Sequence, residues 1–150
     1  MSKEGNKTVR LASLNILNKK ENRSERYHYL LEYLKEVDPD FLLLQEVSDI
    51  PLMVDLLLGA GYPYSIFSGA VGIVSKQPIK QTSILQSKLK DEPTVHAAID
   101  LGHTTLHLIT AHFPWGFAAE YERLLRAKEI STYAKNLIKN NTSRARPENV

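Results

Sequence analysis

The chain has 150 residues, 43% of them hydrophobic and 24% charged, and its 19 Lys and Arg against 17 Asp and Glu give a formal net charge of +2. This length and balance are typical of one soluble globular domain and exclude a disordered chain. A charge this small excludes any argument for polyanion binding from bulk charge, and the absence of cysteine excludes disulfides and thiolate metal sites.

The absence of cysteine also fits a reducing compartment, and we expect a cytoplasmic protein. Residues 1–7 contain no apolar core and are therefore not a signal peptide. The longest apolar runs, such as 41–44 and 56–58, are far too short to span a bilayer, so no membrane span is predicted.

The N-terminal part predicts a strand followed by a helix. Val9 to Leu14 has the pattern of a central strand. Apolar residues at helical spacing then predict an amphipathic helix from about Arg23 to Val37, with Asn22 as a candidate N-cap and Glu25 at the third helical position. Asp38-Pro39 ends this helix, because a residue before proline avoids the helical region.

A second strand–helix pair follows, and then a series of strands. Phe41 to Leu44 is a run of four apolar residues, as expected for a strand covered on both faces. Pro51 can open a short helix through Leu58 that Gly59 or Gly61 closes. The next segments read as strands joined by turns, including a tight turn at Leu101-Gly102-His103-Thr104: Ile66–Ser68, Val71–Ser75, Ile79–Gln86, Val95–Leu101 and Thr105–Ala111.

The C-terminal part predicts one long helix and a polar tail. Residues Ala119 to Lys139 carry apolar side chains at helical spacing. Residues 140–150 are polar and are predicted to form a loop. Together these elements indicate a mixed α/β protein and not a simple βαβ repeat.

Three polar residues stand where predicted strands end, which is where layered α/β folds usually host chemistry. Glu46 follows Gln45 and is the type of carboxylate that holds Mg²⁺, although a strand-end glutamate can also simply face water. Asn15 can ligate a metal or donate to a phosphate, but is also a common turn residue. His112 ends the last predicted strand, whereas His28, His96, His103 and His107 have ordinary strand, helix or turn surroundings.

These segments resemble motifs of the endonuclease/exonuclease/phosphatase superfamily, which includes deoxyribonucleases, abasic-site endonucleases, inositol-polyphosphate phosphatases and neutral sphingomyelinases. Asp38 to Val47 looks like its metal-glutamate motif, and Asn15-Ile16-Leu17 looks like its first motif. Thr110 to Phe113 looks like its Thr-His-Leu motif, with Ala111 as an extra residue. The resemblance implies that Glu46 binds Mg²⁺ or Mn²⁺, that Asn15 assists at the metal and the phosphate, and that His112 binds the phosphate and stabilises charge in the transition state.

Weaker signals support the same family. Gly72 to Ile79 resembles its Gly-x-x-x-Ser-x-x-Pro strand, which we interpret as architectural, with Ser75 a minor phosphate candidate. Arg123 resembles an Arg that follows the His motif and is a candidate phosphate ligand, or else a solvated or ion-paired helix residue. Trp115 is expected to pack under its own loop, with stacking on a base or sugar as the alternative.

The superfamily also uses an Asp-x-Asn pair and a C-terminal Asp-His pair, neither of which occurs in this sequence. We therefore predict an α/β fold of the α+β type: the N-terminal half of a four-layered α/β/β/α sandwich, with a mixed, mostly antiparallel sheet and flanking helices. Residues 1–150 would form a partial domain whose C-terminal half is absent, and each half would supply most of one sheet, so an apolar sheet face would be left exposed.

The function predicted from the resemblance is Mg²⁺-dependent phosphoester hydrolysis, with this chain alone inactive. The substrate would be a phosphoester of a nucleic acid, a phospholipid or a sugar phosphate, and the partner a missing C-terminal half or a second copy. The alternative is a non-catalytic, self-associating module that keeps the half-fold. A nucleic-acid-binding domain is a weaker third option, because such domains usually have a concentrated basic face.

Overall fold

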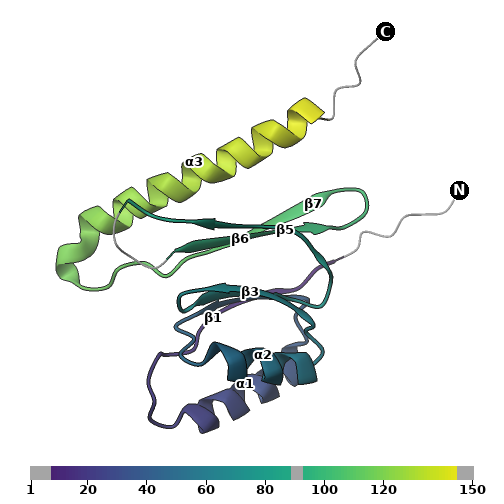
Figure 1. Cartoon of the computed structure of the whole chain (residues 1–150), viewed down its shortest axis with the longest axis vertical. Coiled ribbons are helices and arrows are strands. Elements are labelled where there is room, and N and C mark those ends of the chain that lie inside the picture. The colour runs from purple at the N-terminus through teal and green to yellow at the C-terminus, as the bar shows by residue number, and fades with distance from the viewer. Residues whose placement is uncertain (1–7, 89–92, 145–150) are drawn as a thin grey trace, which may run out of the picture. The chain divides into compact units, whose positions relative to one another are not determined.

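The computed structural model describes residues 8–88 and 93–144. They divide into two compact units, the first made of residues 8–86 and 93–112 and the second of residues 87–88 and 113–144. The first unit contains every strand and the two shorter helices, and the second contains the long C-terminal helix (Figure 1). None of the helices in the described ranges is long and apolar enough to cross a membrane.

The first sheet of the first unit, sheet A, mixes parallel and antiparallel pairing. Its strands lie in the order β1-β2-β4-β3, and their bounds are β1 Leu11–Asn15, β2 Phe41–Gln45, β3 Tyr64–Ser68 and β4 Val71–Ser75. β1 and β2 are parallel and are joined through helix α1 (Arg23–Val37), whereas β4 runs antiparallel to both β2 and β3. The parallel pair brings the C-terminal ends of β1 and β2 to the same edge of the sheet.

The second sheet, sheet B, is an antiparallel meander that packs face to face on sheet A. It contains β5 (Ile79–Leu85), β6 (Thr94–Asp100) and β7 (Thr105–Thr110), in that order. Seven buried residues form the layer between the two sheets: Phe41, Val71, Ile73, Val95, Ala97, Ile99 and Leu108. This layer explains the unbroken apolar run at the start of β2, because that strand is covered on both faces.

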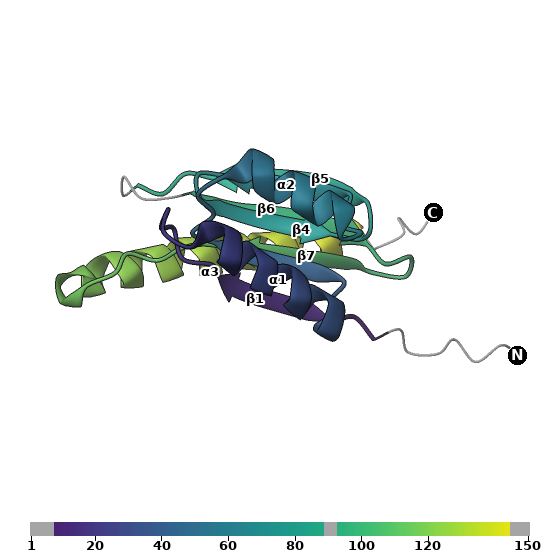
Figure 2. The ribbon, with the colours of Figure 1, turned by 90° about the horizontal axis from the view of Figure 1, so that it is seen from below.

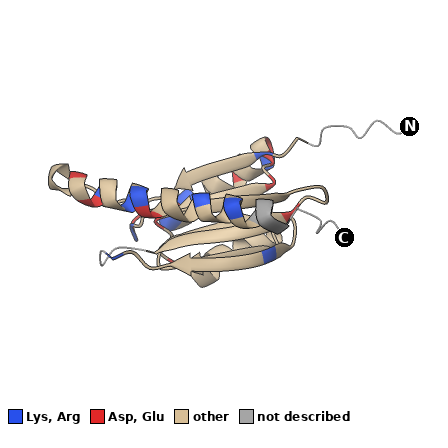
Figure 3. Ribbon diagram, turned by 90° about the horizontal axis from the view of Figure 1, so that it is seen from above, with Lys and Arg blue, Asp and Glu red and all other residues tan. Residues whose placement is uncertain are grey.

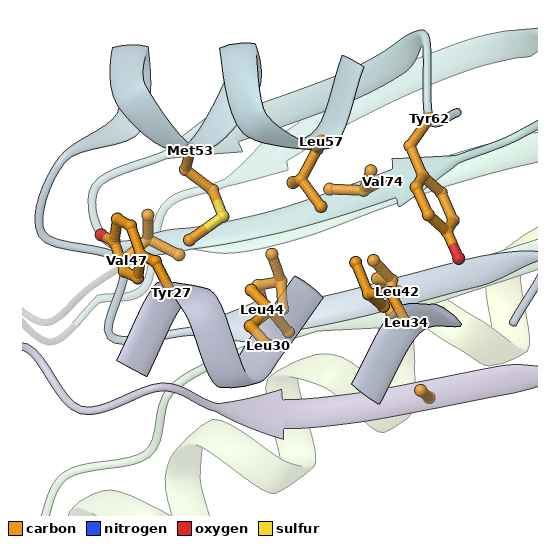
Figure 4. Packing of buried hydrophobic residues seen from close by; sticks show 11 residues of the cluster. Tyr27, Leu30, Leu34, Leu42, Leu44, Val47, Met53, Leu57, Tyr62 and Val74 are labelled. Carbon is orange, nitrogen blue, oxygen red and sulfur yellow. The ribbon is translucent and has the colours of Figure 1, made fainter. Parts of the chain in front are cut away.

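Two helices cover the other face of sheet A. Helix α1 and helix α2 (Ile50–Gly59) lie side by side there, as Figure 2 shows. Tyr27, Leu30 and Leu34 of α1 point toward Met53 and Leu57 of α2 and toward the sheet residues beneath them (Figure 4). The spacing that predicted α1 is therefore the spacing of the residues it buries.

The predicted α/β class, with a mixed sheet, an antiparallel sheet and flanking helices, is confirmed. The bounds predicted for α1 are also confirmed. The expectation that this chain supplies most of only one sheet is wrong, because β5 to β7 build a second sheet whose inner face meets sheet A. The meander folds back after Pro78, so the apolar face of sheet A that lies over β6 and β7 is already covered.

The capping prediction for α1 is wrong in its details. Asn22 does occupy the N-cap position, but its backbone is left-handed (φ 52°) and its side chain makes no capping hydrogen bond. Asp49, which was not predicted as a cap, does cap α2, where its carboxylate accepts from the backbone N–H of Leu52. An N-cap side chain normally needs an extended backbone to reach back to the helix, and Asn22 does not have one.

The second unit consists of a loop, a short 3-10 turn (η1, Phe117–Ala119) and helix α3 (Glu120–Arg144). The prediction of a loop from residue 140 is wrong for residues 140–144, which continue the helix, while residues 145–150 lie outside the described ranges. A polar composition alone does not stop a helix, and the sequence from Glu120 to Arg144 contains neither proline nor glycine. Trp115 is 88% exposed, so the expectation that it packs under its own loop is wrong.

The charges of α3 are arranged unevenly along its length. Figure 3 shows acidic and basic residues interspersed over the N-terminal part of this helix. After Glu129 its sequence to Arg144 contains only basic charged residues, namely Lys135, Lys139 and Arg144. The helix is therefore not uniformly basic, which gives no new support to the nucleic-acid-binding alternative.

Candidate functional site

The parallel register of β1 and β2 brings two of the predicted site residues together. Asn15 lies opposite Gln45, and Glu46 is the first residue after β2. The backbone N–H of Ile16 donates to the carbonyl of Gln45 over 3.0 Å, which extends the ladder by one bond beyond the two strands. Both side chains therefore stand at the same edge of sheet A.

Asn15 holds Glu46 through its amide. Its Nδ2 donates to Oε1 of Glu46 over 2.8 Å, while its Oδ1 accepts from the backbone N–H of Leu17 over 3.0 Å. The Leu17 N–H needs an acceptor, and this fixes which end of the amide faces the carboxylate. In this geometry Asn15 positions the carboxylate. The prediction that Asn15 is itself a ligand of the metal stays a prediction.

Glu46 accepts hydrogen bonds on both carboxylate oxygens. Oε2 accepts from the backbone N–H of Asn18 over 2.9 Å, in addition to the Asn15 bond at Oε1. The Asn15 side chain and then the Asn18 amide lower the pKa of Glu46 below its ordinary value, with smaller contributions from His112 and Lys19, and burial opposes the shift. The carboxylate is thus kept ionised, as a metal ligand must be.

His112 closes the cluster from the other sheet. Its Nε2 lies 3.3 Å from Oε1 of Glu46, and the two side chains are 26% and 24% exposed. Two residues earlier, Thr110 accepts a 2.9 Å hydrogen bond at its Oγ1 from Nε2 of Gln45, so that a polar bridge joins β2 to β7 directly beside the site. Asn15, Glu46 and His112 therefore meet in space, although their sequence positions span almost a hundred residues.

The donor set fits a hard divalent cation held by few protein ligands. The carboxylate of Glu46 is ionised and partly open to solvent, and its Oε2 accepts one hydrogen bond from the described residues, which leaves it a lone pair for a cation. Mg²⁺ commonly uses one or two carboxylates, several waters and substrate phosphate oxygens. Within residues 8–88 and 93–144, no group of three or more His, Asp or Glu side chains is close enough to hold a metal by itself.

The other histidines lie elsewhere. His96 on β6 is fully buried, and its Nε2 lies 3.0 Å from Nδ1 of His107 on β7, with the two rings stacked. Burial and then the neighbouring His107 lower the pKa of His96. His28 and His103 are exposed on α1 and in the β6–β7 turn. None of these four takes part in the Glu46 cluster.

Two weaker candidates have structural partners of their own. Ser75 pairs with Phe41, the first residue of β2, whereas Glu46 follows the last residue of that strand. The Ser75 hydroxyl is buried and bonds to the backbone of Gln77, so the suggested phosphate contact by Ser75 is wrong. Arg123, in the second unit, donates from Nη1 to the carbonyls of Pro114 and Gly116 over 3.2 and 2.8 Å. Its phosphate contact stays a prediction.

Several groups at the site were missed from the sequence. The part played by the Asn18 backbone N–H cannot be predicted from a sequence motif, because any residue except proline supplies such a group. Lys19 was not singled out, although its charge acts on Glu46. Gln45 was noted only as the residue before Glu46, yet it makes the hydrogen bond that joins the two sheets. The run of polar residues from Asn18 to Asn22 was the available signal that this loop has a role.

A hollow adjoins this cluster. It has a volume of about 300 Å³ and contains Asn15, with a mainly apolar lining of Leu14, Ile16, Leu17, Arg26, Tyr29, Leu30 and Tyr33. A larger hollow of about 470 Å³ between α1 and α2 contains no member of the Glu46 cluster. The larger of these two hollows is therefore not the one beside the Glu46 cluster.

The sequence matches a family model over residues 12–143, and that model describes the Endonuclease/Exonuclease/phosphatase family. The comparison with curated proteins gave no match. The matched residues include Asn15, Glu46 and His112.

Solved structures share the fold at low sequence identity. A crystal structure of TDP2 from C. elegans has a TM-score of 0.79 and 19% identity, over 88% of this chain and 44% of that one. A β-hairpin deletion mutant of beta toxin from Staphylococcus aureus has a TM-score of 0.66 and 20% identity, over 95% and 64% of the two chains. A protein of the same family from Leptotrichia buccalis has a TM-score of 0.57 and 15% identity, over 71% and 54%. This chain thus spans about half the length of the structures it resembles.

Proposed function

Since the chain belongs to the Endonuclease/Exonuclease/phosphatase family, we propose that it carries the metal-binding and phosphate-binding part of a phosphoesterase site that uses Mg²⁺ or Mn²⁺. The observation that carries this proposal is the ionised Glu46 carboxylate, held between Asn15 and His112 at one edge of the two sheets. The solved structures contribute the fold and not the activity.

Each residue of the cluster has a separate part in this proposal. Glu46 holds the cation, and Asn15 keeps the carboxylate oriented toward it. A cation bound there supplies Lewis-acid polarisation of a phosphoryl oxygen. His112 donates a hydrogen bond to a second phosphoryl oxygen, which stabilises the charge that builds up as the phosphoester bond breaks.

Activation of the attacking water requires a further group. A general base, most often a histidine or a carboxylate, must lie within hydrogen-bond reach of the water. In this proposal His112 binds the phosphate, so the base has to be another group. Apart from Glu46, no Asp or Glu among the described residues of the first unit joins this cluster. We therefore propose that the 150-residue polypeptide hydrolyses phosphoesters slowly or not at all unless another polypeptide segment supplies the base.

The substrate class stays broad in this proposal. One of the similar structures, TDP2 from D. rerio, is described as complexed with a single strand DNA product. The groups assigned to this chain address a phosphate and a cation, which nucleic acids, phospholipids and sugar phosphates all present. We propose a phosphoester of one of these classes as the substrate.

Metal binding tests the proposal directly. Titration of the purified chain with Mn²⁺, followed by calorimetry and by water proton relaxation, is expected to show one site that Mg²⁺ displaces and that Glu46→Gln removes. Glu36→Gln is the matched control, because Glu36 is exposed on α1 and takes no part in the cluster. Equal Mn²⁺ binding by the wild type and by Glu46→Gln would refute the proposal.

A second candidate function, self-association without catalysis, is favoured by the two strands at one side of the first unit. Within the described ranges, β1 pairs only with β2, and β7 pairs only with β6. β2 lies over β7, so both open edges face the same side, and neither strand contains Lys, Arg, Asp, Glu or Pro. Edge strands that avoid pairing usually carry such residues.

Solution size separates the two functions. Sedimentation of the purified chain is expected to give a discrete dimer if the module reading is correct, and Leu11→Lys on the exposed edge of β1 is expected to dissociate it. If the chain is a monomer that binds Mn²⁺ through Glu46, self-association is excluded and the proposed metal site is supported.

A further inference from the structure

The loop that follows Asn15, residues 16–22, is held by one arginine side chain of helix α1. Arg26 donates from Nη2 to the carbonyl of Leu17 over 3.2 Å, and also bonds to the carbonyls of Lys19 and Glu21. Its Nε is buried as well and has no hydrogen-bond partner within the described part of the chain. The half-buried side chain therefore lies against the loop and does not simply extend into solvent.

The same loop supplies the backbone groups that orient the proposed ligand. The N–H of Leu17 donates to Oδ1 of Asn15, and the N–H of Asn18 donates to Oε2 of Glu46. Arg26 binds the carbonyl of the Leu17–Asn18 peptide, and Glu46 accepts from the N–H of that same peptide. A shift of the loop would therefore move both hydrogen bonds together.

The loop also contains backbone conformations that require support. Leu17 has φ 60° and Asn22 has φ 52°, both in the left-handed region that non-glycine residues rarely adopt. Such conformations persist only where the surrounding contacts fix them. The Arg26 bond to the Leu17 carbonyl is one of those contacts, and the 2.8 Å bond from the Lys19 N–H to the same carbonyl is another.

We propose that Arg26 is a positioning residue for the Glu46 site: by binding three carbonyls of the 16–22 loop, it fixes the Leu17 and Asn18 amides that hold Asn15 and Glu46. It touches neither the carboxylate nor any reacting atom. The part of this proposal that concerns metal affinity rests on the proposed function, whereas the part that concerns the loop and its amides does not.

The chemistry of the side chain explains why an arginine stands here. A guanidinium presents its donors in a rigid planar fork, whereas a lysine ammonium is a single point on a flexible stem. Nη1 bonds to the Glu21 carbonyl and Nη2 to the carbonyls of Leu17 and Lys19, which uses both arms of the fork. Arg23, one turn earlier on α1, is the natural comparison, because its side chain pairs with Asp49 over 3.0 Å and with none of these carbonyls.

The test uses the full chain and two readouts. Amide hydrogen exchange at Leu17 and Asn18 is measured by NMR, and Mn²⁺ affinity is measured by calorimetry, for Arg26→Ala, Arg26→Lys and the matched control Arg23→Ala. Arg26→Ala is expected to speed exchange at both amides and to weaken Mn²⁺ binding about 10-fold to 100-fold, the usual effect of losing a residue that supports metal ligands. Arg26→Lys is expected to lie between Arg26→Ala and the wild type, and Arg23→Ala to leave both readouts unchanged.

The outcomes separate this proposal from the proposed function. Unchanged exchange at Leu17 and Asn18 in folded Arg26→Ala, or an equal effect of Arg23→Ala, overturns the positioning role. If Arg26→Ala does not fold, Arg26→Lys carries the test, and wild-type exchange in that variant overturns the role. If the wild type binds no Mn²⁺, the proposed function fails, while the exchange data still decide whether Arg26 holds the loop.

Discussion

The amide of Asn15 and the carboxylate of Glu46 are joined by a 2.8 Å hydrogen bond across the ends of two parallel strands. The bond depends on register, because Asn15 ends β1 opposite Gln45 and Glu46 follows directly. A slip of one residue in either strand would turn one of the two side chains to the other face of the sheet.

Removal of the Asn15 amide is expected to loosen Glu46 without removing it. Asn15→Ala deletes the largest of the effects that lower the pKa of Glu46, so this pKa should rise. Affinity for Mn²⁺ should fall about 10-fold to 100-fold. Asn18→Ala is the matched control, because Asn18 acts through its backbone N–H, which alanine retains. Calorimetry and NMR titration of the carboxyl carbon measure the two effects. Equal losses in both variants would contradict this assignment.

Acid should destabilise the chain partly through Glu46. Its pKa is lower in the folded state than its ordinary value of 4.5, so the unfolded chain binds the proton first as the pH falls. The stabilisation is therefore fully present above that value and is lost as the pH falls through the folded pKa. Urea unfolding across this range should show a steeper loss for the wild type than for Glu46→Gln. Parallel curves would show that Glu46 has no such linkage.

The hydrogen bond between Gln45 and Thr110 is expected to stabilise the contact between the two sheets. Thr110→Val keeps the shape of the buried side chain but removes the acceptor, and should lower the free energy of unfolding by about 1 kcal/mol. Thr105→Val, at the half-buried start of the same strand, is the control and should change it by less than about 0.5 kcal/mol. Urea denaturation gives both values. An unchanged free energy of unfolding in Thr110→Val would show that this hydrogen bond does not stabilise the fold.

Two glycines should respond to alanine in opposite directions. A Cβ on Gly72 in β4 would overlap the ring of Phe67, so Gly72→Ala should destabilise the fold by about 1–3 kcal/mol or more. A Cβ on Gly59, the last residue of α2, meets nothing within 4 Å, and Gly59→Ala should stabilise the fold by about 0.4–1 kcal/mol. Thermal and urea unfolding measure both. A tolerated Gly72→Ala would mean that Phe67 can move aside.

The sequence predicted the elements well because their signals are local. Apolar spacing located α1 with its observed bounds, and the run from Phe41 marked a strand that is covered on both faces. Asn15, Glu46 and His112 were found because each ends a strand and stands in a motif-like segment. Their meeting at 2.8 and 3.3 Å depends on strand register and sheet stacking, which no single segment encodes.

The features that the sequence did not predict depend mainly on long-range strand pairing and on backbone conformation. Nothing in the sequence from Ile79 to Thr110 indicates that its strands form a separate sheet that faces β2 and β4. The support of the 16–22 loop by Arg26 was also out of reach, because it depends on left-handed residues at both ends of the loop. Residues 140–144 are helical although their composition predicts a loop, because polar residues occur in loops and in helices alike.

Glu46 itself has a left-handed backbone, with φ 58°. Glycine adopts that conformation readily, whereas a side chain with a Cβ is strained there. Glu46→Gly would thus relieve the backbone, but it would also remove the carboxylate that Asn15 and Asn18 hold, so the backbone and the side chain make opposite demands on this one position. The left-handed backbone at position 46 is therefore kept by what the carboxylate does there, namely its two hydrogen bonds and its proposed part in phosphoester chemistry.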